Sequence, residues 1–194
     1  MVTELDLSEK LKMSRTPIRE ALQDLEAEGL VKSYPARGTI VTELMKSDVE
    51  EIHELRVLLE VWALKKSFIF IHNTDLDYAE NLFKEAYESQ NWDKFHIADR
   101  FLHNLMVVKS GSTRVIGFLH ALNSQIERIR RVSARDVHRI DASYAEHMEI
   151  IDKIRMHNLD QALTTLEKHL RSVSNSAIQT FQNMEIALPE RILQ

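Results

Sequence analysis

The residues that interrupt helices are few in this chain, and most of them lie near its start. Its 194 residues include four glycines and three prolines. Four of these seven lie between residues 17 and 38, and the long remainder holds only Gly111, Gly117 and Pro189. Because glycine and proline are the strongest breakers of regular structure, this distribution predicts a short mixed segment followed by a nearly pure helical body. It also indicates two domains.

The overall composition excludes several classes of protein. A formal net charge of −5 rules out a uniformly basic nucleic-acid coat, so any contact with nucleic acid has to come from a local cluster. Without cysteine the chain has no disulfide framework. It also lacks an apolar run near the ~18 residues of a membrane span and a signal peptide at its start. We therefore expect no membrane partner and a cytoplasmic location.

The mixed segment at the front has the pattern of two helices and a hairpin. Residues 3–12 form a predicted helix that Thr3 and Asp6 cap reciprocally. A second helix begins at Ser14 or Thr16, carries Pro17 in its first turn and ends at Gly29. Its apolar residues Ile18, Ala21, Leu22 and Leu25 have helical spacing and predict one buried face. The stretches "LVKSYP" and "TIVTEL" around "ARG" then predict two strands and a tight turn.

From residue 47 onward the pattern is helical throughout. Ser47 is the expected cap of a helix whose apolar residues Val49, Ile52, Leu55, Leu59 and Trp62 step by three or four. Turn signals divide the rest, which predicts six helices at about 48–71, 75–89, 92–109, 113–132, 137–156 and 159–184. Short loops between long helices predict an antiparallel all-helical bundle.

Two arginines stand at the start of the second helix. In a helix-turn-helix, the first residues of the second helix meet base edges in the major groove, and Arg15 and Arg19 are four residues apart on one side of it. Residues 1–44 hold six Lys or Arg against eight Asp or Glu, but four of the eight acids fall at 20–28, away from the helix tip. By spacing alone, solvated surface charges on an ordinary helical hairpin are an equally good interpretation.

The stretches "SRTPIREALQDLEAEGLV" and "PARGTIV" resemble the signature of GntR-type bacterial winged-helix repressors. The resemblance covers residues 3 to about 44, and it implies a DNA-binding domain over residues 1–45. It also implies the DNA contacts, which are Ser14, Arg15, Thr16, Arg19 and the wing residues Arg37 and Gly38. Domains of that family begin with a further helix, which is missing here, so this winged helix is partial and we expect weak DNA binding by the chain as written.

The nine histidines divide into two groups. His53, His72, His120, His138 and His157 follow no shared spacing and read as surface or helix-end residues. Asp99 and His103 are four apart on one predicted helix, so a carboxylate and an imidazole face the same way and can chelate one metal ion. His147 and His169 lie on apolar stripes of two later helices, where a histidine is usually a hydrogen-bonded core residue. If all four side chains converge on one point, however, a metal site explains them better than separate core roles do.

The helical body resembles the ligand-binding domain called FCD, in the six-helix VanR-type subgroup of the FadR-like branch. The resemblance covers about residues 48–184, and "EIHELRVLLE" matches the opening helix. It implies a domain over residues 46–186, a tail at 187–194 and a metal set that maps to Asp99, His103, His147 and His169. Such a set suits Zn²⁺, Ni²⁺ or Mn²⁺ with one or two positions open. His96 is a candidate alternate ligand or a supporting residue.

FCD resemblance also implies a small organic acid as effector, bound at or beside the metal. Arg56 is the first candidate to bind its far carboxylate, since guanidinium binds carboxylate bidentately. Ser143, one turn before His147, is a candidate hydroxyl donor. Arg130 is a further candidate to bind the acid. It belongs to a basic run with Arg128, Arg131, Arg135 and Arg139, most of which we expect to be solvated or at an interface.

Together these features predict a mainly α protein, a metabolite-responsive transcriptional regulator that binds operator DNA as a homodimer, and not an enzyme. Paired operator half-sites about one helical turn apart require the two-fold assembly. One alternative is a metal-dependent hydrolase, since three histidines, a carboxylate and a water can run hydrolysis. Another is a helical dimerisation module without ligand.

Overall fold

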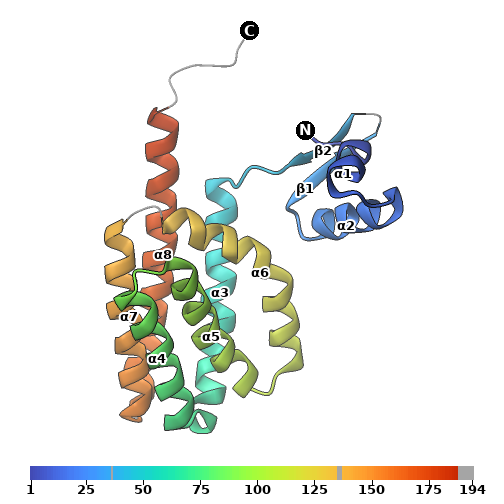
Figure 1. Cartoon of the computed structure of the whole chain (residues 1–194). Coiled ribbons are helices and arrows are strands. Elements are labelled where there is room, and N and C mark those ends of the chain that lie inside the picture. The colour runs from blue at the N-terminus through green and yellow to red at the C-terminus, as the bar shows by residue number, and fades with distance from the viewer. Residues whose placement is uncertain (36, 135–136, 188–194) are drawn as a thin grey trace.

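The computed structural model describes residues 1–35, 37–134 and 137–187 (Figure 1). The elements in chain order are α1 (Glu4–Leu11), α2 (Arg15–Ala27), β1 (Val31–Tyr34), β2 (Gly38–Val41), α3 (Lys46–Ser67), η1 (Phe68–Phe70), α4 (Asn73–Glu88), α5 (Trp92–Lys109), α6 (Thr113–Ser133), α7 (Val137–Arg155) and α8 (Leu159–Ala187). The mainly helical class is confirmed, with a two-stranded wing ahead of a multi-helix bundle. Residues 188–194 of the predicted tail, and Arg135 of the basic run, lie outside the described residues, whereas Ala187 is the last residue of α8.

The N-terminal unit is two helices and a hairpin. Thr3 and Asp6 form the predicted capping box at α1, and Lys12, in the left-handed conformation with φ 54°, makes the turn into α2. In the hairpin β1 and β2 pair antiparallel, and Val2 adds a bridge to Thr39. At Gly38 φ is +97° and a Cβ would stand 2.8 Å from the carbonyl oxygen of Val2, so only glycine fits.

The predicted buried face of α2 is only half right. Ile18 and Leu22 are buried, but Ala21 is exposed and Leu25 is 37% exposed. Helix α2 packs mainly on α1 and on β1 of the wing. The periodicity identified the helix, but the number of packing partners decided which of its apolar residues are buried.

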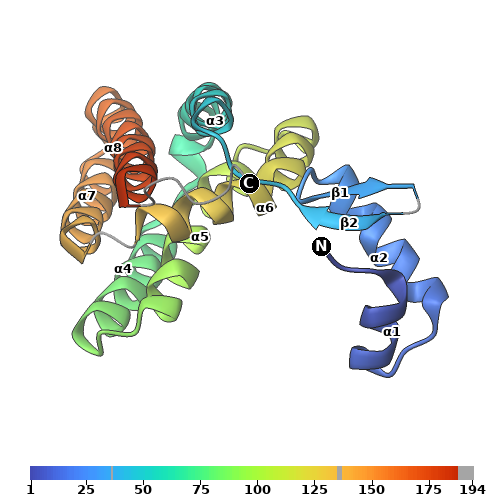
Figure 2. The same ribbon diagram turned by 90° about the horizontal axis from the view of Figure 1, so that it is seen from above.

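The bundle is built around α3, which packs against α8, α5 and α6 (Figures 1 and 2). Helix α4 packs against α5 and α7, and α7 against α8, so the layer of α7 and α4 closes one side. The largest buried cluster joins side chains from all of these helices except α6, with Phe83, Leu102 and Leu166 fully buried. The stripes around His147 and His169 are buried as predicted, through Ile150, Ile151, Ile154, Leu166, Leu170 and Val173.

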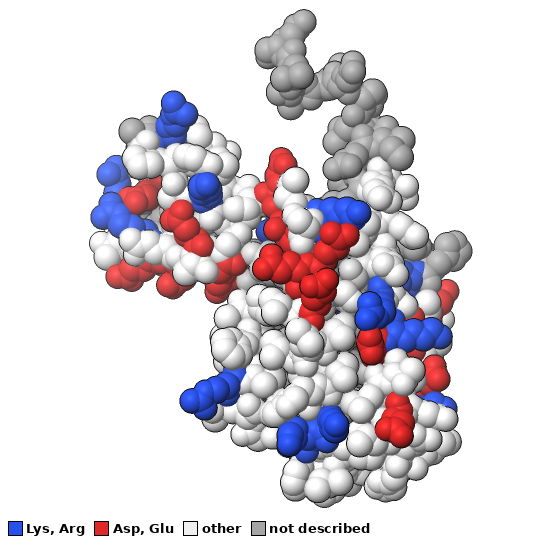
Figure 3. All heavy atoms as spheres, turned by 180° about the vertical axis from the view of Figure 1, so that it is seen from behind, with Lys and Arg blue, Asp and Glu red and all other residues white. Residues whose placement is uncertain are grey.

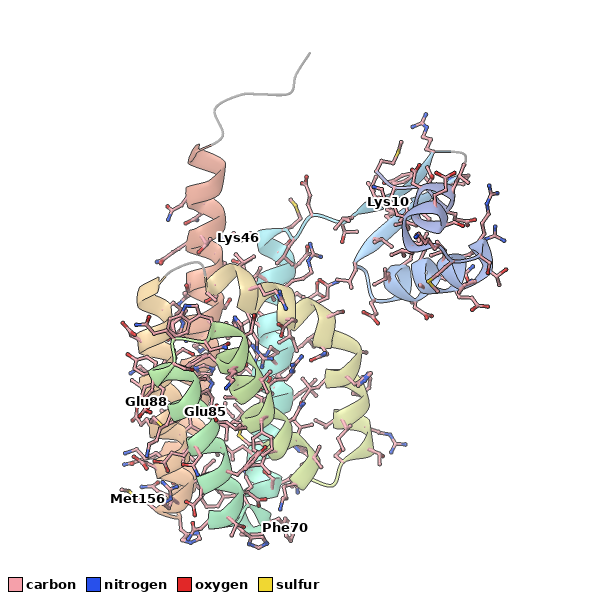
Figure 4. The ribbon with its side chains drawn as sticks, in the orientation of Figure 1. Lys10, Lys46, Phe70, Glu85, Glu88 and Met156 are labelled. Atoms are coloured by element: carbon pink, nitrogen blue, oxygen red, sulfur yellow. The ribbon has the colours of Figure 1, made fainter. Side chains whose placement is uncertain are left out.

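The ends of the bundle helices match the predicted ones within a few residues, with one wrong cap. Helix α3 begins at Lys46 because the Asp48 carboxylate accepts the N–H of Met45 at 2.8 Å, so Ser47 is not the cap. At its other end α3 stops at Ser67 and continues as the short 3-10 turn η1. Figure 4 shows α3 running the length of the bundle, from the labelled Lys46 near the N-terminal unit to the labelled Phe70 at the far end.

The buried face of α3 differs from the predicted stripe. Val49 and Ile52 are buried, whereas Leu55 and Trp62 are 38% and 41% exposed. Beyond Ile52 the inward positions hold Arg56 and Glu60, each 3% exposed. The predicted apolar stripe is therefore buried only at the start of this helix, and farther along a charged pair points into the bundle together with Ala63 and Leu64. Among the described helices, none is long and apolar enough to cross a membrane.

Candidate metal centre

Four side chains from three helices converge inside the bundle. Asp99 and His103 come from consecutive turns of α5, His147 from the middle of α7 and His169 from α8. One ligand atom of each lies within 4.8 Å of the others, and all four residues are buried. A tetrahedral shell with bonds of ~2.1 Å separates its ligand atoms by ~3.4 Å, so the cluster is close to the size of a metal shell. The structure thus brings together the four residues that the sequence analysis named as a metal set.

Each imidazole is held through its Nδ1 atom. His103 Nδ1 lies 2.5 Å from Glu60 Oε2, His169 Nδ1 lies 2.8 Å from Glu146 Oε2, and His147 Nδ1 lies 2.7 Å from the carbonyl oxygen of Ser143. Carboxylates and carbonyls only accept hydrogen bonds, so all three Nδ1 atoms donate. This fixes the tautomer that leaves the Nε2 lone pairs available, as metal-binding histidines require.

The three Nε2 atoms are among the buried polar atoms without a hydrogen-bond partner. Among the described residues, Nε2 of His103, His147 and His169 are buried and have no hydrogen-bond partner. His147 Nε2 and His103 Nε2 lie 3.1 Å and 3.7 Å from Asp99 Oδ1, without the alignment of a hydrogen bond. Three orphaned acceptors aimed at one carboxylate are costly in a folded core unless a cation binds them. The residues present therefore fit a divalent metal ion.

Supporting residues were not found from the sequence. Glu60 holds His103 and is held in turn by Arg56, whose Nε donates to Glu60 Oε1 at 2.8 Å. Glu146 holds His169 and accepts Nη2 of Arg139 at 2.6 Å. Only their positions in the sequence could have indicated this supporting role: Glu60 is four residues after Arg56 on the same helix, and Glu146 directly precedes His147.

The electrostatics of the cluster favour an ionised Asp99 and neutral imidazoles at His147 and His169. Burial acts to raise the pKa of Asp99, but the charge of Arg130 and then of His103 outweighs it and the net pKa is well below the usual range. Burial lowers the pKa of His147, and it lowers that of His169 further. For Glu60, burial is outweighed by Arg56 and His103, so its pKa is lowered too. These are the protonation states in which such groups bind a metal.

A small cavity opens beside Asp99. Its volume is ≈ 30 Å³, about one water molecule. Its walls include Asp99, Arg130, Arg139, Ser143 and His96. Nε of Arg130 lies 2.7 Å from Asp99 Oδ2, which makes Arg130 the nearest counter-charge of the cluster.

The effector residues predicted from the sequence are divided between two places. Arg130 and Ser143 line the cavity, but Arg56 is not among its walls, because its guanidinium is bound to Glu60. His96 is half-buried at the wall and is not one of the four clustered residues. The prediction that Arg139 is solvated or at an interface is wrong. Arg139 is only 7% exposed and lines the cavity.

The predicted DNA contacts lie together on the N-terminal unit. Ser14 is at the N-cap of α2 without a side-chain bond, and Arg15 begins the helix. Arg15, Arg19, Arg37 and Gly38 line one hollow between the helices and the wing. Arg19 makes a two-bond pair with Glu4 of α1, at 2.8 Å for both bonds, so α1 fixes its side chain.

Comparisons with known proteins agree with this architecture. The model of the FCD domain matches residues 51–172, and the model of bacterial regulatory proteins of the gntR family matches residues 1–41. The transcriptional regulator YdhC of Bacillus subtilis (strain 168) is 26% identical over 166 residues, which cover 83% of this chain and 74% of YdhC. The transcriptional repressor RspR of Escherichia coli (strain K12) is 23% identical over 184 residues, covering 93% and 81%.

Solved structures share the fold. The Zn²⁺-bound FCD domain of TM0439 superposes with a TM-score of 0.65 at 24% identity, covering 73% of this chain and 99% of that domain. E. coli McbR/YncC gives 0.79 at 18% identity, covering 93% and 87%. The chain is a regulator with a helix-turn-helix and a C-terminal helical bundle. It belongs to the GntR family of bacterial transcriptional regulators, with a C-terminal FCD domain, and its relatives are regulators rather than enzymes.

Proposed function

We propose that this regulator senses a small organic acid through a divalent metal bound by Asp99, His103, His147 and His169. The observation that carries the proposal is the set of three buried Nε2 atoms that lack hydrogen-bond partners and surround one carboxylate. The Zn²⁺-bound FCD domain of TM0439 supports it by analogy of fold. Three neutral imidazoles and one carboxylate suit Zn²⁺, Ni²⁺ or Mn²⁺.

The acid binds in the cavity beside the cluster. A four-ligand shell leaves one or two positions open, and a carboxylate is a suitable ligand for them. Arg130 and Ser143 are on the cavity wall, so we assign them to binding the acid. Arg56 does not contact the acid and contributes only by holding Glu60, which in turn holds His103. A bound metal neutralises Asp99 and so frees the guanidinium of Arg130 for the acid.

The N-terminal unit reads operator DNA. Its domain comprises residues 1–45, with residues 46–186 forming the sensor. Ser14, Arg15 and Thr16 at the tip of α2 meet the DNA together with Arg37 and Gly38 of the wing, and Glu4 sets the direction of Arg19. As a DNA-bound regulator the protein acts in the cytoplasm.

Two copies associate through the outward face of α3 and α6. Leu55, Leu58 and Trp62 of α3, and Phe118 of α6, are between 38% and 68% exposed, and Figure 3 shows this face as a broad field with few charges. Exposed acids lie toward the start of α3, and Lys65 and Lys66 lie at its end. An antiparallel pairing of two α3 helices about a two-fold axis brings each acidic end to a basic end.

Helix α6 connects the sensor to the DNA reader. Arg130 of α6 faces the cluster, and two residues earlier, on the other side of the helix, Arg128 Nη2 donates to the carbonyl oxygen of Thr42 at 2.7 Å. Gln125 Nε2 donates to the carbonyl oxygen of Glu28 at 2.8 Å. Among the described residues, and apart from the bonds that Met45 makes at the start of α3, these two side chains make the hydrogen bonds between the bundle and the N-terminal segment. A shift of α6 on acid binding therefore changes how the DNA reader is held.

The proposal is tested by DNA affinity. A preferred DNA sequence is first selected from a random pool, and its affinity is measured by fluorescence anisotropy with metal, with metal and acid, and with chelator. We expect the acid to change the affinity only when metal is present. His147→Ala should remove this response but keep DNA binding. A response that survives in the variant, or that needs no metal, would contradict the proposal. The absence of bound metal and of any acid response would leave a helical dimerisation module.

A further inference from the structure

The metal cluster is surrounded by a balanced set of buried charges. Three guanidinium groups and three carboxylates lie in and around it. They are Arg56, Arg130 and Arg139, and Glu60, Asp99 and Glu146, with side chains at most 17% exposed. They form three pairs, in which the ion-pair distances are 2.8, 2.7 and 2.6 Å. With neutral imidazoles the formal charge of this set is zero.

A divalent ion breaks this balance. Its two positive charges enter a region where every carboxylate already has an arginine partner. Uncompensated charge is expensive to bury, and a monocarboxylate at the metal would compensate only half of it. A ligand that carries two negative charges restores neutrality.

The second negative charge has a place to bind. Arg130 and Arg139 both line the cavity. Nε of Arg139 is buried and has no hydrogen-bond partner among the described residues. Arg130 makes no hydrogen bond with another described residue, and its one ion pair is with Asp99, whose charge the metal would take over. Two guanidinium groups on the cavity wall thus have N–H donors available for a second carboxylate, and the Ser143 hydroxyl lines the same cavity.

We infer that the effector is a short dicarboxylate, with one carboxylate at the metal and the other between Arg130 and Arg139. This inference rests on the proposed function. The cavity of ≈ 30 Å³ is too small for the acid while Arg130 stays on Asp99, so the metal has to bind first and release that arginine. Dicarboxylate binding should consequently require the metal.

The test compares succinate with butyrate, which have the same number of carbons and differ by one carboxylate. Isothermal titration calorimetry on the metal-loaded full chain should show succinate binding about tenfold tighter or more, as expected for one additional charge-assisted pair. Arg139→Gln should reduce this preference to about threefold or less. Arg131→Gln is the matched control, because Arg131 lies on α6 with a side chain 69% exposed, and it should keep the preference. Elemental analysis of each sample verifies that the metal is retained.

Each outcome bears on a different claim. If butyrate binds as tightly as succinate, the dicarboxylate inference is wrong and the proposed acid sensor stands. If inorganic phosphate binds tighter than succinate, the site is selective for a dianion of another class and the inference is also wrong. If no acid binds the metal-loaded protein, the proposed function itself fails. If Arg139→Gln retains both the metal and the full preference for succinate, the second carboxylate does not bind between these arginines. If Arg139→Gln loses the metal, Arg139→Lys replaces it in the test, because lysine keeps the charge and should retain the preference. Loss of the preference in metal-loaded Arg139→Lys would refute the inference.

Discussion

Replacing Glu60 by glutamine separates a supporting role from a ligand role. Glu60 does not belong to the four clustered residues, yet its Oε2 atom lies 2.5 Å from Nδ1 of His103 and its Oε1 atom accepts Nε of Arg56 at 2.8 Å. Glutamine keeps the shape and one acceptor oxygen but removes the negative charge. The imidazole becomes a weaker ligand, because a carboxylate partner raises the basicity of the opposite nitrogen.

Two effects of different size are expected from Glu60→Gln. Loss of a carboxylate that supports a metal-bound histidine costs about 10–100-fold in metal affinity, which is about 1.4–2.7 kcal/mol. Breaking a fully buried ion pair costs the fold about 3–5 kcal/mol, because Arg56 keeps its charge with no partner. The double variant Arg56→Met with Glu60→Gln removes that stranded charge, so it should recover much of the stability and none of the metal affinity.

Competition between the protein and a chromophoric chelator measures the affinity, and thermal unfolding with and without metal measures the stability. Ser143→Ala is the matched control, because Nδ1 of His147 is held by the backbone oxygen at 2.7 Å and the Ser143 hydroxyl lies at 3.3 Å. Its metal affinity should change less than about threefold. Equal affinity in Glu60→Gln and wild type would show that His103 is not a ligand held by Glu60, and the reasoning would be refuted.

Three further outcomes follow from other parts of the molecule. Arg128→Ala should leave metal and acid affinity unchanged while the acid no longer alters DNA affinity, and an unaltered response in fluorescence anisotropy would remove α6 as the link. Leu58→Glu combined with Trp62→Glu should give a folded monomer by light scattering, since both side chains are exposed, and a persistent dimer would place the interface elsewhere. Hydrogen bonds from Lys109 and from the His72 N–H lower the pKa of Asp75, so its contribution exists above pH 3.8 and disappears as the pH falls through the lowered value. Asp75→Asn should therefore cost about 0.5–1 kcal/mol at pH 7 and progressively less as the pH falls below 3.8 in denaturant titrations, and a difference independent of pH would contradict this.

Helix positions were predictable because helical periodicity, capping residues and turn signals are local. The Thr3–Asp6 box and the breaks near residues 72, 90, 110 and 157 needed no knowledge of packing. Which face is buried depends on neighbours far away in the chain. On α3 the apolar stripe of Leu55 and Trp62 points outward, and the inward face carries Arg56 and Glu60. Hydrophobicity alone assigns the middle of that helix to the wrong face, whereas Val49 and Ile52 at its start are buried as the pattern predicts.

The metal cluster was predictable in part. The spacing of Asp99 and His103 sets them on one side of one helix, but only the family resemblance joined them to His147 and His169. Glu60 and Glu146 were missed because a charged residue reads as solvated until its buried partner is known. The burial of Arg139 was missed for the same reason. Its partner Glu146 is seven residues away on the same helix, and no simple spacing rule pairs residues at that distance.

Anomalous diffraction from crystals of the metal-loaded protein tests the central claim most directly. Data collected at the absorption edge of the bound metal locate it without reference to any other feature. The account predicts one strong peak per chain, about 2.0–2.2 Å from Nε2 of His103, His147 and His169 and from an oxygen of Asp99. A bundle without a peak among these atoms, or with a metal bound only at surface histidines, would contradict it.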